Sequence, residues 1–121
     1  MVSLDEIFNN PFAKEALAKI DLPNSIKNNL KPGFGERSYQ IEAFKRYIYL
    51  DQADFKEKPK KPFHLLYNMA TGSGKTLIMA GLILFLYQKG YRNFLFFVNS
   101  NNIIQKTKDN FLNPHALKYL F

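Results

Sequence analysis

A glycine-spaced loop constrains this chain more than any other feature of its sequence. The loop joins an apolar run at 63–68 to a helical segment that begins at Lys75. Glycines let the backbone curl until consecutive N–H groups point into one cavity, and the N-terminus of the following helix also attracts anions. A lysine offers a cation to the β- and γ-phosphates, and a threonine offers a hydroxyl ligand to Mg²⁺. The loop therefore predicts a nucleoside triphosphate site with magnesium, formed by Ala70, Thr71, Gly72, Ser73, Gly74, Lys75 and Thr76.

Two residues of this loop carry specific chemical predictions. Lys75 is the predicted catalytic residue, because it is the one side-chain cation placed to meet the phosphates, and Thr76 is the predicted metal ligand. The alternative is a glycine-rich turn that only resembles a phosphate loop. Its position between a predicted strand and a predicted helix argues against that alternative.

The segments around the loop predict an α/β fold. The runs 63–68 and 94–98 are short and mainly apolar, as expected for strands of a parallel sheet that are buried on both faces. Between them, residues 75–89 form a predicted helix that Gly90 ends. The three segments make one βαβ unit, which the general rule expects to be right-handed.

The remaining elements are predicted to be helical or irregular. Residues 3–20 read as a helix with a capping box at Ser3 and Glu6, broken near Asn10 by the following proline. Residues 22–35 read as a loop with one short helical turn. The last helices are expected at 38–51, capped by Ser38, and at 101–111, beginning at Ser100 or Asn101, with a charged connector at 55–62.

Composition narrows the class of protein and of partner. The 17 basic and 10 acidic residues give a net charge of +7, which suits nucleic acid or nucleotide and equally suits a basic surface that keeps the protein soluble. The absence of cysteine fits a reducing compartment. The longest apolar run, 77–87, is shorter than the roughly 20 residues that span a bilayer. We therefore expect a cytoplasmic protein with no membrane partner.

The loop also resembles a known motif. The pattern G-x-x-x-x-G-K-T would place a glycine at Met69, and the string that begins Met-Ala-Thr-Gly instead resembles motif I of superfamily 2 DEAD/DEAH-like helicases and translocases. It is most similar to the restriction (Res) subunit of type III restriction enzymes. This resemblance implies a partial RecA-like P-loop domain of parallel strands flanked by helices. Residues 37–121 would form the front of that domain, truncated before the acidic motif, and residues 1–36 a helical amino-terminal extension and loop.

Two further segments resemble motifs of the same superfamily. Arg37 and Gln40 match its Arg-x-Tyr-Gln element, in which the glutamine reads the edge of adenine, and an amide can donate and accept together at that edge. The turn after the second apolar run resembles motif Ia, which implies DNA backbone contacts from Asn99, Ser100 and Asn101. Without the phosphate loop, Arg37 and Gln40 would read as ordinary surface residues at a helix start. An ordinary strand-to-helix turn explains residues 99–101 equally well.

The family's later motifs do not follow in this sequence. Its acidic pair and its second motor domain are absent, so we expect an amino-terminal fragment of a longer ATP-dependent DNA translocase or helicase. The resemblance implies ATP and Mg²⁺ as cofactors, with DNA and a modification methyltransferase subunit as partners. The nuclease activity implied by the resemblance would lie elsewhere in the parent enzyme. The alternatives are a type I restriction motor subunit or another superfamily 2 helicase, a nucleotide- or DNA-binding module without hydrolysis, and a P-loop kinase.

The first testable prediction concerns Lys75. We expect Lys75→Ala to weaken ATP binding roughly tenfold to 100-fold, because charge-assisted contacts contribute about 1.5–3 kcal/mol each. Isothermal titration calorimetry on the wild type and the variant measures this loss. Unchanged affinity in the variant would contradict the assignment of the loop.

Overall fold

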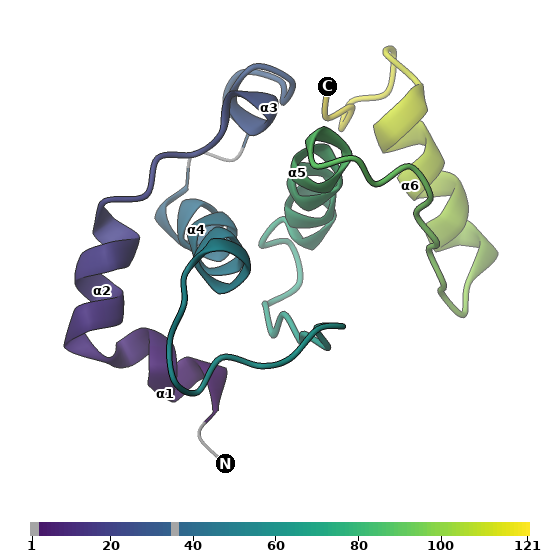
Figure 1. Ribbon diagram of the computed structural model, residues 1–121. Coiled ribbons are helices and arrows are strands. Elements are labelled where there is room, and N and C mark those ends of the chain that lie inside the picture. Colours follow the sequence, from purple (N-terminus) through teal and green to yellow (C-terminus); the bar gives the residue numbers. More distant parts are fainter. Residues whose placement is uncertain (1–2, 35–36) are drawn as a thin grey trace.

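The computed structural model describes residues 3–34 and 37–121, and its regular elements are helices (Figure 1). Helix α4 lies between α1 and α2 on one side and α5 on the other, and α6 lies beyond α5. The predicted boundary after residue 36 falls outside the described residues. The helices of the described chain are α1 (Leu4–Asn9), α2 (Pro11–Ala18), α3 (Asn24–Lys27), α4 (Ser38–Gln52), α5 (Lys75–Gln88) and α6 (Asn101–Leu112).

The amino-terminal helices confirm the predicted capping box and the predicted break near Asn10. The Ser3 hydroxyl accepts from the Glu6 amide at 3.2 Å, and the Glu6 carboxylate accepts from the Ser3 amide at 3.1 Å. The side chain of Asn10 accepts from the Phe12 amide at 2.9 Å, so α2 restarts with Pro11 in its first turn. The short turn predicted within 22–35 is α3. The predicted cap Ser38 is wrong, because the cap position of α4 belongs to Arg37, which makes no side-chain capping bond.

The core joins α3, α4 and α5 across the described chain. Phe44 of α4 has no exposed surface and lies against the backbone of Gly81 in α5. A Cβ added at Gly81 would lie 2.3 Å from the Phe44 ring, so the two helices approach closely because this residue has no side chain. The buried apolar cluster consists of Ile26, Leu30, Phe44, Ile48, Leu77, Ile78, Ala80, Phe85 and Leu120.

The carboxyl-terminal residues close this core. The Leu120 carbonyl accepts from the Lys31 amide at 2.7 Å, and the Leu120 amide donates to the Asn110 carbonyl at 3.0 Å. The ring of Phe121 meets the ring of Phe111 edge to face, with centroids 5.6 Å apart. The chain end thus connects the loop after α3 to α6. Within the described residues, no helix is both long enough and apolar enough to cross a membrane.

The prediction of strands at 63–68 and 94–98 is not confirmed, because the described residues contain no strand. Both runs lack helical structure, and no backbone hydrogen bond joins either run to the rest of the described chain. Along 63–69 exposure alternates with period two, and Tyr67 and Met69 pack against the core while Leu66 is 92% exposed. In the second run Leu95 and Phe97 are each 84% exposed. The two runs do not pair with each other as strands. The predicted α/β class would therefore require other backbone segments to pair with them.

This arrangement predicts the pattern of amide hydrogen exchange. We expect the amides of 63–69 and 94–98 to exchange close to the unprotected rate, because no backbone acceptor holds them. Amides in the buried middle of α4 should exchange much more slowly and serve as the internal control. Exchange measured by mass spectrometry or NMR tests this, and protected amides in both runs would show sheet pairing within the chain.

Candidate nucleotide-binding site

The glycine-spaced loop folds as a tight turn that leads directly into α5. Two of its glycines have a left-handed backbone, with φ of +79° at Gly72 and +96° at Gly74, and Gly74 is the N-cap of α5. The Ala70 carbonyl accepts from the Ser73 amide at 3.2 Å and from the Ser73 hydroxyl at 2.6 Å. These positive φ angles suit glycine and strain other residues, so the glycine spacing is what allows this turn.

The two residues predicted to touch phosphate and metal begin α5. Lys75 is exposed and Thr76 is half-buried, and the first helical hydrogen bond runs from the Ile78 amide to the Gly74 carbonyl at 3.0 Å. Thr71 and Gly72 are also exposed at the mouth of the turn. The start of α5 thus combines a solvent-facing ammonium, a hydroxyl and the free N–H groups of a helix N-terminus, which together suit a phosphate group.

Gln40 lies directly beneath this loop. Its side-chain amide nitrogen donates to the Ser73 carbonyl at 3.1 Å, across 33 positions of sequence. Gln40 is 6% exposed, and a Cβ on Gly74 would lie 2.6 Å from the same nitrogen. The amide therefore fills the space that the glycine leaves. An amide has two N–H groups and one oxygen, so a single bond to Ser73 leaves hydrogen-bonding capacity for a ligand.

Arg37 lies at the same end of α4 but does not contact the loop through any hydrogen bond. Its guanidinium donates to the Tyr39 hydroxyl at 3.0 Å, and that bond raises the pKa of Arg37. Tyr39 is 42% exposed, so the pair lies at the surface. Arg37 is therefore charged, and its other guanidinium N–H groups lie near the start of α4.

The residues predicted to contact DNA lie at the beginning of α6. Ser100 is its N-cap without a side-chain capping bond, and Asn99 and Asn101 are exposed. Helices α5 and α6 begin toward the same end of the molecule in Figure 1. The polar turn therefore lies toward the same end as the phosphate loop, and no backbone hydrogen bond connects the two in the described chain.

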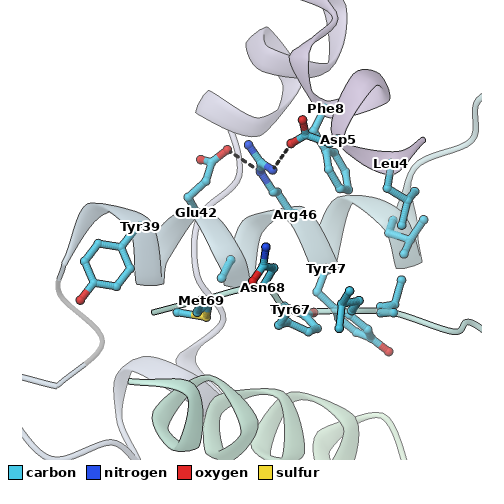
Figure 2. Close-up of a pocket in the computed structure, with 14 residues that line it drawn as sticks. Leu4, Asp5, Phe8, Tyr39, Glu42, Arg46, Tyr47, Tyr67, Asn68 and Met69 are labelled. Carbon is cyan, nitrogen blue, oxygen red and sulfur yellow. Dashed lines mark hydrogen bonds and ion pairs between the residues drawn. The ribbon is translucent and has the colours of Figure 1, made fainter. Parts of the chain in front are cut away.

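A separate open cavity of about 670 Å³ lies between α1, α4 and the run that precedes the loop (Figure 2). Its one guanidinium, from Arg46, is paired with Glu42 at 3.0 Å and with Asp5 at 3.5 Å. Tyr67 also borders the cavity, and burial raises the pKa of its hydroxyl, which stays protonated. Lys75 and Thr76 do not line this space. The cavity is therefore open space beside the run at 65–69, with no free cation to hold a phosphate.

Sequence reasoning missed one charged cluster. Asp51, in the last turn of α4, has a side chain that is 5% exposed and pairs with Lys89 and, at 3.4 Å, with Lys61. The signal was available, because Asp51 follows Phe44 and Ile48 at helical spacing on the buried face. The described chain contains no group of three or more His, Cys, Asp or Glu side chains that is arranged to hold a metal.

The sequence is similar to those of known restriction enzyme subunits. A sequence model of the family "Type III restriction enzyme, res subunit" matches residues 33–119. The chain is 48% identical over 104 residues to the "Probable type III restriction-modification enzyme HindVIP Res subunit" of Haemophilus influenzae. That alignment covers 83% of this chain and 20% of the relative, so the chain spans about a fifth of the relative's length. No solved structure matches the chain significantly.

The position of Gln40 leads to a prediction that separates two roles. We expect Gln40→Ala to weaken binding of inorganic triphosphate about two- to tenfold, which corresponds to one lost hydrogen bond beneath the loop. If the amide also reads adenine, the loss for ATP exceeds the loss for GTP. Titration of the wild type and the variant with all three ligands measures both effects. Equal losses for ATP and GTP would contradict the adenine contact, and an unchanged triphosphate affinity would contradict the role beneath the loop.

Proposed function

The chain belongs to the family of type III restriction enzyme Res subunits, and from this premise we propose that it forms the ATP-binding part of a DNA translocase motor. The observation that carries the proposal is the turn at Gly72 and Gly74, which opens directly onto the N-terminus of α5 with Lys75 and Thr76 in its first turn. Buried Gln40 supports this turn from below. The same features fit ATP with Mg²⁺ as the ligand.

Each part of the loop has a distinct role in this proposal. The N–H groups of the turn and of the first turn of α5 donate to phosphate oxygens, and the Lys75 ammonium adds a positive charge. The Thr76 hydroxyl would hold Mg²⁺, which neutralises phosphate charge when it is bound. Gln40 would contact the adenine edge while its other donor stays on the Ser73 carbonyl. Arg37 would lie close to the base or ribose with its charge available.

The proposal also accounts for the two uncovered apolar runs. We infer that 63–68 and 94–98 become parallel strands of a RecA-like sheet when a longer protein supplies the strands that pair with them. Leu66 and Phe97 would then be buried by that sheet and its helices, and the cavity beside 65–69 would be filled by a neighbouring segment. In this arrangement residues 37–121 form the front of the domain and residues 1–36 its helical extension.

DNA and a modification methyltransferase subunit are the partners that this function implies. The polar turn at Asn99, Ser100 and Asn101 would donate to the DNA backbone, since side-chain and helix N-terminal donors suit phosphate. The net charge of +7 favours this contact. The alternative functions are those of a type I motor subunit, another superfamily 2 helicase, a P-loop kinase and a non-hydrolysing binding module. The identity of 48% to a Res subunit favours the type III assignment among them.

The proposal generates a test of catalysis. We expect the isolated 121-residue chain to bind ATP but not to hydrolyse it, with or without DNA. Two acidic residues on either side of the loop in sequence already have partners. Asp51 is paired with lysines, and Asp109 accepts a hydrogen bond from Gln105 at 3.1 Å. In phosphoryl transfer an arginine finger alone contributes about 10³–10⁵ in rate, and residues 3–34 and 37–121 place no arginine in hydrogen-bond contact with the loop.

The assay is phosphate release by the purified chain, with Lys75→Ala as the control for contaminating ATPases. DNA-stimulated turnover that disappears in this control would show that the chain contains a catalytic carboxylate. Asp109, Asp51 and Asp54 would then be substituted first. Failure of the wild-type chain to bind ATP at all would contradict the proposed function itself.

A further inference from the structure

Each end of helix α4 makes a polar contact with α5 or with the loop that precedes α5. Near its start, Gln40 donates to the Ser73 carbonyl of the loop. In its last turn, Asp51 pairs with Lys89, the C-cap residue of α5, across 38 positions of sequence. The two attachment points are separated by roughly 16 Å along α4, at about 1.5 Å per residue. The helix therefore runs beside most of α5 and reaches both of its ends.

The attachment at Asp51 is more than a surface ion pair. The carboxylate is 5% exposed, and it receives the ammonium groups of Lys89 from α5 and of Lys61 from the connector. Lys89 also lies 5.4 Å from the centre of the buried Phe85 ring. Lys58 donates to the Ala53 carbonyl at 2.6 Å and to the Asp51 carbonyl at 3.4 Å, which closes the C-terminus of α4.

Charge and burial act in opposite directions on this carboxylate. Burial by itself raises the pKa of Asp51, but the hydrogen bonds and charges of Lys89 and then of Lys61 outweigh it and hold the pKa below its ordinary value. Tyr47 also faces the group, and burial first and the charge of Asp51 second raise its pKa. The carboxylate is therefore charged near neutral pH.

The packing between the two ends is close. Phe44 has no exposed surface and lies on Gly81, Ile48 is 3% exposed, and the Tyr47 and Phe85 rings meet edge to face at 6.0 Å. A close-packed contact of this kind transmits a displacement rather than absorbing it. A shift of α4 at its carboxyl end therefore reaches Gln40 at its amino end.

We propose that Asp51 is a positioning residue for the phosphate loop, and this inference rests on the proposed triphosphate binding. Together with Lys89 and Lys61, the carboxylate fixes the distal end of α4 so that Gln40 stays on the Ser73 carbonyl. Without this pair, the distal end of α4 is displaced from α5, and the close-packed helix carries this displacement to the bond beneath the loop, which weakens. The loop then holds triphosphate less well, although none of its own residues has changed.

The experiment is a double-mutant cycle on triphosphate affinity, with inorganic triphosphate and ATP as probes. Asp51→Asn removes the charge at nearly constant shape, and we expect it to weaken binding about two- to tenfold, no more than the loss in Gln40→Ala. In the Gln40→Ala background, Asp51→Asn should change the affinity little further, because the bond through which it acts is already missing. Asp51→Glu keeps the charge and should retain most of the affinity.

Three controls separate positioning from general destabilisation and from failure of the proposed function. Leu17→Ala changes a buried residue of α2, away from both attachments, and should leave triphosphate affinity unchanged in folded protein. If Asp51→Asn does not fold, Lys89→Met breaks the same pair at a side chain that is 37% exposed. The inference would be overturned if Asp51→Asn lowered triphosphate affinity equally in the wild-type and Gln40→Ala backgrounds. It would also be overturned if Asp51→Asn did not lower the affinity at all. No binding by the wild type, or no effect of Lys75→Ala, would instead overturn the phosphate site.

Discussion

The close approach of Phe44 to Gly81 is the contact on which the rest of the described structure depends. It brings α4 and α5 together at a distance that only a residue without a side chain allows, since a Cβ at Gly81 would lie 2.3 Å from the ring. Ile48, Leu77 and Phe85 extend the same buried contact along both helices. Once this interface forms, the start of α4 lies under the loop and its end lies beside the end of α5.

The polar contacts at the two ends of the interface follow from that packing. The bond from Gln40 to Ser73 is buried, and a buried amide without a partner is costly, so the loop carbonyl and the glutamine stabilise one another. At the other end, the carboxylate of Asp51 is withdrawn from water and is stabilised by two lysines. Neither polar group would be buried in this way if the two helices did not pack.

The apolar runs on either side of α5 show the limit of this packing. Helix α5 is apolar on all its faces, yet α3 and α4 cover only part of it, and Leu82 and Leu84 remain half-buried. The runs at 63–68 and 94–98 flank it without pairing, and residues such as Leu95 remain in water. Uncovered apolar surface of this kind is typical of protein interfaces.

The sequence by itself determined the local features of this protein. The glycines that require positive φ, the lysine and threonine after them, the capping box at Ser3 and the break before Pro11 all follow from the conformations open to a few neighbouring residues. The lengths of α4, α5 and α6 were predicted to within about two residues, because apolar periodicity and helix-ending residues act over short ranges.

Only the tertiary structure decided which distant groups meet. The contact of Gln40 with Ser73 and the pairing of Asp51 with Lys89 join residues more than 30 positions apart, and no local pattern specifies such pairs. For the same reason, the predicted helices are present in the described chain and the predicted strands are not. A helix satisfies its backbone hydrogen bonds within its own segment, whereas a strand needs a partner that is distant in sequence, and the described chain supplies none.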